Sequence, residues 1–217
     1  MQKTKNASTN EITMELYNMF LQDRQHEYAV HNTQSVLSYC GESDFISVNK
    51  SGNIIEVEVK ISRADFKNDF TKKNRHEHLK GKAVIRRNHY AGRRNYELKH
   101  PVNQIYCPNG LSLSKKLKWY SIECFEMQSL MTYDIPNYFY FAIPEGVVKI
   151  DDIPLYCGVL FAKVQEYQWK GKTMRNVVLY EARKPKKLTD RKVDDKQVHA
   201  MLRCQSFKWT NRLRKEQ

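Results

Sequence analysis

Apolar residues at helical spacing mark the first predicted element of the chain. Within residues 9–22, apolar side chains recur every three or four positions: Ile12, Leu16, Met19 and Phe20. This spacing predicts a helix with one apolar face. Thr9 or Asn10 can cap its start, because both side chains accept hydrogen bonds from first-turn amides.

A strand, a turn and a second strand are predicted next, over residues 44–60. Two β-rich runs flank residues 49–53, where Gly52 supplies the conformational freedom of a turn. Directly after them, Ser62 and Asp65 have the spacing of a capping box, so a second helix is expected to start near residue 63.

Further strands and a final helix are predicted in the second half. Residues 137–144 form a continuous apolar run stopped by Pro144, and residues 156–164 and 175–182 read as further strands. Within residues 194–214, apolar side chains again approach helical spacing: Val198, Leu202, Trp209 and Leu213. We therefore expect a C-terminal helix after a basic link.

The intervening residues 73–132 are rich in Lys and Arg at their start and lack a clear period, which indicates an insertion. The pattern as a whole predicts one α/β domain of the α+β kind over residues 1–217, with a mixed β-sheet flanked by helices. Its core would span 9–72 and 133–183, and a C-terminal basic link and helix would span 184–217.

The net charge of the chain indicates the class of partner that it binds. The 217 residues contain 37 Lys and Arg against 24 Asp and Glu, a formal net charge of +13. Such a chain favours polyanions, nucleic acid first, although a basic surface can also serve only solubility. The five cysteines form no C-x-x-C pair, and no segment has the length and apolarity of a membrane span or a secretory signal. We expect a cytoplasmic protein with no membrane partner.

The second predicted strand carries charges inside an Ile/Val run. Alternate strand residues share a face, so Glu56, Glu58 and Lys60 are expected on the face opposite to the apolar side chains. If residues 49–53 are the loop, Val48 pairs with Ile54, and the antiparallel register then sets Asp44 opposite Glu58. Two carboxylates beside an ammonium suit a divalent-metal site. The simpler interpretation is a half-exposed strand with surface ion pairs.

Asp44, a turn, and then Glu58-Val59-Lys60 resemble the PD-(D/E)XK nuclease superfamily. More narrowly, "SDFISVNKSGNIIEVEVKISRADFKNDF" with the later "NYFYFAIP" and "GVLFA" is similar to the MmcB-type DNA-repair proteins of that superfamily. The resemblance covers residues 35–72 and, loosely, 137–163. Ser43 stands where the superfamily name has a proline. The resemblance implies a restriction-endonuclease-like fold, with elements in the order α-β-β-β-α-β.

The resemblance also implies an activity, which is metal-dependent hydrolysis of DNA phosphodiester bonds in repair, recombination or mobile-element and phage biology. Asp44, Glu58 and the Val59 carbonyl would bind Mg2+ or Mn2+. Lys60 would orient or deprotonate the attacking water, or stabilise developing charge. Glu15, with Glu11 behind it, would add an acid from the first helix, and Glu56 would support the site from outside it.

Several residues outside the motif are candidates for nucleic-acid contacts or have structural interpretations. Candidate phosphate contacts are Lys72, Lys73, Arg86, Arg87, Arg93 and Arg94. His76 and His78 have zinc-ligand spacing, but solvated or phosphate-contacting histidines fit better. Asp65 is interpreted as a helix cap. Core packing is the interpretation of the three tryptophans, Trp119, Trp169 and Trp209.

Two other classes of function stay open. One is a catalytically inactive nucleic-acid-binding module on the same fold, and the other is a basic interaction protein unrelated to nucleases. The last requires Asp44, Glu58 and Lys60 to lie far apart. A homodimer is compatible with every one of these interpretations.

Overall fold

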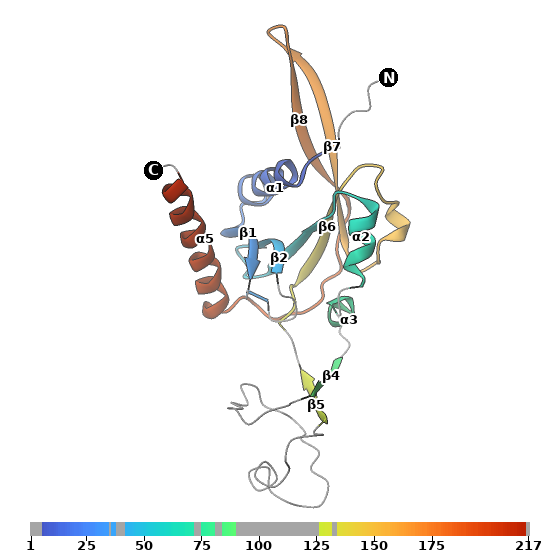
Figure 1. Ribbon diagram of the computed structural model, residues 1–217, viewed down its shortest axis with the longest axis vertical. Coiled ribbons are helices and arrows are strands. Elements are labelled where there is room, and N and C mark those ends of the chain that lie inside the picture. Colours follow the sequence, from blue (N-terminus) through green and yellow to red (C-terminus); the bar gives the residue numbers. More distant parts are fainter. Residues whose placement is uncertain are drawn as a thin grey trace, which may run out of the picture.

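A six-stranded mixed sheet organises the chain in the computed structural model (Figure 1), which describes residues 6–34, 36–37, 42–71, 75–80, 84–89, 126–131 and 134–215. The strands stand in the order β1-β2-β3-β6-β7-β8. β3–β6 and β6–β7 are parallel pairs and the others are antiparallel. The strands are β1 (Tyr28–Gln34), β2 (Glu42–Val48), β3 (Ile54–Val59), β6 (Tyr138–Pro144), β7 (Gly158–Trp169) and β8 (Lys172–Arg183). The predicted mixed sheet flanked by helices is therefore confirmed.

The predicted hairpin has the predicted register. Val48 pairs with Ile54 and Phe45 with Val57, as predicted, and the paired positions of the two strands end there. Asp44 meets β3 through its side chain, which accepts the Val59 N–H. Within the turn, the Asn49 side chain accepts the backbone N–H groups of Ser51 and Asn53 at 3.0 Å, and Gly52 adopts a φ of 72°. The turn chemistry fixes the register, and the register decides which side chains share a face.

The first helix, α1 (Thr9–Tyr17), starts where it was predicted, but its cap is Ser8 instead of Thr9 or Asn10. Ser8 and Glu11 form a complete capping box. The chain continues as a π-helical turn, Asn18–Asp23, which carries buried Phe20. The predicted cap was wrong by one residue because the reciprocal Ser8–Glu11 pair satisfies two amides at once.

The other helices are α2 (Arg63–Asp69), α3 (Arg75–Leu79) and α5 (Asp195–Lys215), with a short 3-10 turn at Ile150–Asp152. Ser62 caps α2 by accepting the Asp65 N–H at 3.1 Å, which is the Ser62 half of the predicted capping box. α5 matches the predicted C-terminal helix and anchors to the sheet edge, since Met201 is buried and Gln205 donates to the Ala29 carbonyl. No helix among the described residues has the length and apolar character to cross a membrane.

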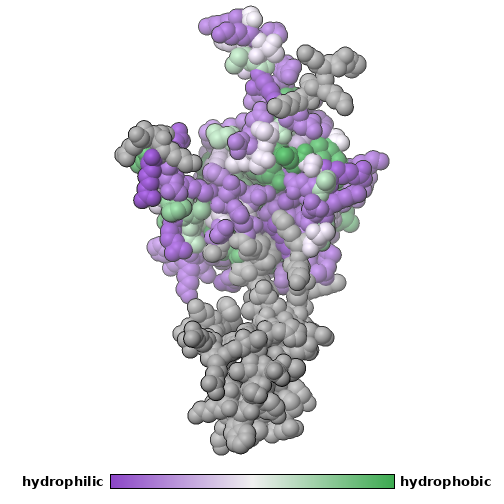
Figure 2. Space-filling model, in the orientation of Figure 1, coloured by the Kyte–Doolittle hydropathy of each residue, from purple (hydrophilic) through white to green (hydrophobic). Residues whose placement is uncertain are grey.

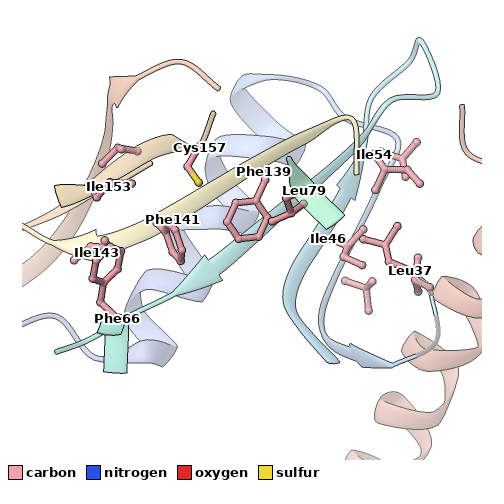
Figure 3. Packing of buried hydrophobic residues seen from close by; sticks show 14 of the residues in the cluster. Leu37, Ile46, Ile54, Phe66, Leu79, Phe139, Phe141, Ile143, Ile153 and Cys157 are labelled. Carbon is pink, nitrogen blue, oxygen red and sulfur yellow. The ribbon is translucent and has the colours of Figure 1, made fainter. Parts of the chain in front are cut away.

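Side chains alternate between two hydrophobic clusters on opposite faces of the sheet. Phe45, Val57 and Tyr140 belong to the cluster that α1 covers with Ile12 and Leu16. On the other face, Phe139 and Phe141 belong to a cluster with Phe66 of α2 and Leu79 of α3 (Figure 3). Met201 of α5 belongs to the same cluster. Glu56 and Glu58 alternate with Val57, so they lie on the face that α2 and α3 cover.

The segment predicted as an insertion contributes to that core. Leu79 is fully buried in it, and Arg75, His76 and His78 of the same helix, α3, are also buried. Further along, β4 (Val84–His89) and β5 (Glu126–Met131) pair with each other as a separate antiparallel ladder. The start of the predicted insertion, which contains α3, therefore belongs to the packed domain.

Two of the three tryptophans are exposed, so the prediction that they pack in the core was wrong. Trp169 lies near the end of β7 with 58% of its surface exposed, and Trp209 of α5 is 63% exposed. Trp119 lies outside the described residues. β7 and β8 are also longer than predicted, and their far ends project beyond the sheet (Figure 1).

Candidate functional site

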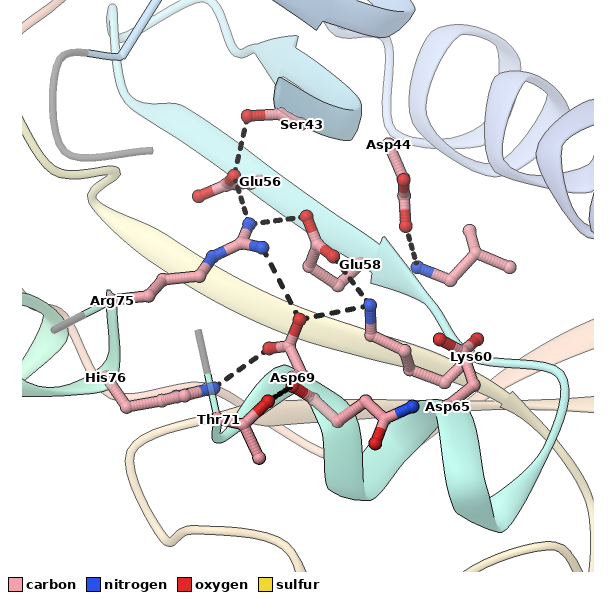
Figure 4. A network of polar contacts seen from close by, with 12 residues as sticks. Ser43, Asp44, Glu56, Glu58, Lys60, Asp65, Asp69, Thr71, Arg75 and His76 are labelled. Atoms are coloured by element: carbon pink, nitrogen blue, oxygen red, sulfur yellow. Dashed lines mark hydrogen bonds and ion pairs between the residues drawn. The ribbon is translucent and has the colours of Figure 1, made fainter. Parts of the chain in front are cut away.

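The structure brings Asp44, Glu58 and Lys60 together. Glu58 near the end of β3 is 1% exposed, and Lys60 just after it is 3% exposed, with Nζ 2.8 Å from Glu58 Oε2. The Asp44 carboxylate on β2 accepts the Val59 N–H at 2.9 Å, directly beside Glu58 (Figure 4). The three side chains therefore do not lie far apart, as the interpretation of the chain as a basic interaction protein required.

The charged row is buried and does not lie on a half-exposed strand. Every residue of β3 is buried on both faces, including Glu56 and Glu58. Ionised side chains leave water at a high cost unless they are paired and hydrogen-bonded. The simpler interpretation, surface ion pairs on a solvated face, is therefore wrong, and each charge here has a specific partner.

Asp69, the last residue of α2, extends the cluster. It is fully buried, and its carboxylate lies 3.1 Å from Lys60 Nζ and 2.9 Å from His76 Nε2. The other ring nitrogen of His76 lies 2.6 Å from the Tyr156 hydroxyl, and the ring stacks on Phe70 at 4.2 Å between centroids. His76 and His78 are both buried, so the prediction of solvated or phosphate-contacting histidines was wrong.

Arg75 of α3 supplies a second buried cation. Its guanidinium lies 2.8 Å from Glu56, 3.5 Å from Asp69, and within hydrogen-bonding contact of Glu58. Glu56 also accepts the hydroxyl of buried Ser43 at 2.6 Å. Glu56 thus reaches the cluster through Arg75. In Figure 4, Glu58 lies between Arg75 on one side and Asp44 on the other.

The protonation equilibria of the cluster differ from those of free side chains. Burial, followed by the negative charge of Glu58, raises the pKa of Asp44 from 3.8 to about 6. Burial also acts to raise the pKa of Glu58, but Arg75 and Lys60 outweigh it and lower that pKa. Burial acts to lower the pKa of Lys60, and Glu58 with Asp69 outweighs it and raises that pKa. Lys60 is therefore held as a cation beside an ionised Glu58.

Glu15 and Glu11 lie on α1, which covers the opposite face of the sheet. Glu15 accepts Asn18 Nδ2 at 3.2 Å within its own helical segment, while Glu11 caps α1 and lies 3.3 Å from Arg175. The sheet separates α1 from the face that carries Glu58. The resemblance implied that one of these acids contributes to the site around Glu58, whereas their contacts here are with Asn18 and Arg175.

The predicted nucleic-acid residues are mostly beyond the described part of the chain. Lys72, Lys73, Arg93 and Arg94 lie outside the described residues. Arg86 and Arg87 belong to β4, where their backbones pair with Ser129 and Gln128 of β5. Within the described residues, no group of three or more His, Cys, Asp or Glu side chains is arranged to hold a metal ion.

Sequence reasoning did not place Asp69, Arg75, His76, Tyr156 or Ser43 in the site. For Asp69 a signal existed, since it lies three residues after Phe66, one turn along the same face of α2. Because Phe66 is apolar, its position marks that face of α2 as the one that packs on the sheet, and a carboxylate on a buried face needs a cation. No local pattern marks Arg75, since it sits in a run of basic residues.

Comparisons with known proteins give one distant structural similarity. No family model matches the chain, and no curated protein matches it. A solved structure described as "SPO1766 protein of unknown function from Silicibacter pomeroyi" is similar over 97% of this chain and 91% of its own, with 10% sequence identity and a TM-score of 0.47.

Proposed function

We propose that the protein is a metal-dependent nuclease that hydrolyses phosphodiester bonds of DNA, with Asp44, Glu58 and Lys60 as its catalytic residues. The observation that carries the proposal is the convergence of these three side chains at neighbouring positions on β2 and β3. The chain runs α1-β1-β2-β3-α2 and reaches β6 after α3, β4 and β5, so the order that the resemblance implies is present with these three elements inserted. A net charge of +13 suits a phosphate polymer as substrate.

The donor set suits a hard divalent cation. Asp44, Glu58 and the Val59 carbonyl offer oxygen atoms, the ligands that Mg2+ and Mn2+ prefer. The raised pKa of Asp44 supports this fit, because two carboxylates share a buried region and a divalent cation there would offset their charge. Such an ion supplies an acidified water and charge compensation at phosphorus.

Lys60 acts as a cation in this proposal and not as a base. Glu58 and Asp69 hold it protonated, so it cannot take a proton from water near neutral pH. In the proposal its ammonium instead orients the attacking water or stabilises the negative charge that develops on the phosphate. Asp69 keeps Lys60 in place and is itself fixed by His76 and Arg75.

A second candidate function is a nucleic-acid-binding module that does not cut. The observation that favours it is Arg75, whose guanidinium already pairs with Glu56 and Glu58. A metal ion that binds Glu58 has to share this carboxylate with Arg75 and Lys60, or displace one of them. If neither Arg75 nor Lys60 is displaced, Glu56 and Glu58 have only a structural role, as partners in a permanent ion-pair network.

Digestion of a mixed substrate panel tests the proposal. Single-stranded, duplex, flapped and junction DNA and RNA are incubated with Mg2+ or Mn2+, and the wild type is compared with Asp44→Asn and Lys60→Gln. We expect metal-dependent cleavage that both variants lose by at least about 100-fold, a scale typical of a lost electrostatic group. Asp23→Asn, an exposed acid at the end of the π-helical turn, is the matched control. A wild type that binds nucleic acid and cuts no substrate supports the second candidate.

A further inference from the structure

The far ends of β7 and β8 form a two-stranded arm, defined as residues 165–176, that stands clear of the sheet (Figure 1). All of its residues are exposed. Its tip is a tight turn in which Lys170 has a φ of 49° and Gly171 a φ of 74°, the left-handed pair typical of a two-residue hairpin. The arm is therefore a regular ribbon with no core of its own.

One face of the arm carries large apolar side chains. Tyr167 pairs with Met174 and Trp169 with Lys172, so these four side chains share a face. Tyr167 is 50% exposed and Trp169 58% exposed. On the alternate face, Arg175 contacts the Asn6 carbonyl and Glu11 at the start of α1, which turns the aromatic face away from the helix. Figure 2 shows paler and green residues among hydrophilic ones on this projection.

The stability of the fold does not account for the exposed position of Tyr167 and Trp169. A two-stranded ribbon gains little stability from exposed aromatic residues, and leaving them in water forgoes their burial energy. The tip is also basic: Lys170 and Lys172 flank Gly171, and the Lys170 ammonium lies 5.7 Å from the Trp169 ring centroid. Exposed aromatic faces beside ammonium groups match a ligand with both π-faces and phosphates.

The geometry points to the arm as a binding element for nucleic acid with unpaired bases, in which Trp169 and Tyr167 stack on bases while Lys170 and Lys172 contact the backbone. Duplex bases present only their edges, whereas single strands, bulges and flaps present faces on which an aromatic ring can stack. This inference rests on the proposed function for the class of polymer, and it adds a preference for unpaired segments that the cluster around Glu58 does not provide.

Binding without cleavage tests the arm separately from the nuclease site. The full chain, kept in EDTA, is titrated into labelled oligothymidylate and into a duplex of equal length. We expect Trp169→Ala to weaken single-strand binding about 5- to 150-fold, the range for loss of one stacked base. Trp209→Ala, an equally exposed tryptophan on α5, is the matched control and is expected to bind like the wild type.

Two further readouts make the result decisive. Single-strand binding is expected to quench tryptophan fluorescence in the wild type and in Trp209→Phe, and not in Trp169→Phe. Replacing both Lys170 and Lys172 by Gln is expected to reduce the salt dependence of binding by one to two ion equivalents, as about 0.7 per phosphate contact predicts. Unchanged affinity in Trp169→Ala, or a wild-type dimer that this substitution converts to monomer, overturns the inference. If single-strand binding depends on Trp169, Lys170 and Lys172 as expected but the protein cleaves no substrate, only the nuclease proposal is refuted.

Discussion

The guanidinium of Arg75 on α3 lies 2.8 Å from the carboxylate of Glu56 on β3, and both side chains are buried. This pair joins a helix from the basic middle of the chain to the strand that carries Glu58. Because Arg75 also contacts Glu58, a cation from the chain itself stabilises the carboxylate that the proposed function assigns to a metal. The competition between these two cations gives the proposal its sharpest tests.

Removing Arg75 is expected to destabilise the fold and to increase its response to metal. Arg75→Ala leaves Glu56 and Glu58 buried with less compensation, which costs about 3–5 kcal/mol. Thermal unfolding in EDTA measures this loss, and Mn2+ is then expected to raise the Tm of the variant more than that of the wild type, because the ion replaces the lost charge.

Arg63→Ala is the control, since Arg63 pairs with Asp152 at 3.6 Å on an exposed surface and is expected to contribute about 1 kcal/mol or less. Arg75→Lys retains a charge and provides a folded comparison if Arg75→Ala is too unstable. If Mn2+ stabilises none of these proteins, Glu58 is not a metal ligand and the binding-module candidate is favoured.

Neutralising Asp44 is expected to stabilise the protein above pH 6. The folded-state pKa of about 6 exceeds the ordinary 3.8, so the folded state binds this proton more tightly than the unfolded state. The contribution of Asp44 to stability therefore falls as pH rises from about 4 to about 6. Asp44→Asn removes that penalty, worth about 1–3 kcal/mol at pH 7.5 by the usual conversion of a pKa difference, and little near pH 4.

Chemical denaturation of Asp44→Asn and wild type at both pH values measures this difference. Asp23→Asn provides the exposed reference, with a small effect at either pH. An Asp44→Asn protein that is less stable than the wild type at pH 7.5 would show that the Val59 N–H bond to Asp44 outweighs the burial of charge.

Ser43 is expected to stabilise the site through Glu56. Its buried hydroxyl donates to Glu56 at 2.6 Å, and Ser43→Ala leaves that carboxylate oxygen with one donor fewer. The expected cost is about 1–3 kcal/mol, measured by urea denaturation. Ser51→Ala, in the exposed turn, serves as control and is expected to change stability by less than about 0.5 kcal/mol. Equal effects at the two positions would show that the Ser43 hydroxyl contributes nothing specific.

Gly158 is expected to tolerate no side chain. A Cβ there would lie 2.4 Å from two ring atoms of Tyr140, whose hydroxyl donates to Glu181 at 2.6 Å and so holds the ring in place. We expect Gly158→Ala to cost about 1–3 kcal/mol, the usual range for overpacking. A double-mutant cycle with Tyr140→Ala checks the cause, because relief of the clash makes the combined loss smaller than the sum of the single losses.

Local patterns allowed several elements to be predicted correctly. The alternation in β3, the Asn49–Asn53 turn and the Ser62 cap are short-range features, so the hairpin register and the start of α2 followed directly from them. The resemblance implied a further strand before the second helix, but the pattern did not locate β1, because its residues, "YAVHNTQ", alternate too weakly to stand out from the polar stretch around them. Its pairing with β2 depends on a partner strand and not on its own sequence.

The sequence by itself determined that Glu58 and Lys60 follow one another on one face of the strand and that Asp44 lies beside them across the turn, because strand alternation and the turn length fix those relationships within about 17 residues of chain. Only the tertiary structure decided that this face is buried and that Arg75, Asp69 and His76 complete it. Those contacts arise from packing α2 and α3 onto the sheet, and burial then forces each charge to find a partner. Likewise, only the tertiary structure showed that Trp169 and Trp209 are exposed. For Trp169, the sequence of β7 does not indicate how far this strand extends beyond the neighbouring strands of the sheet.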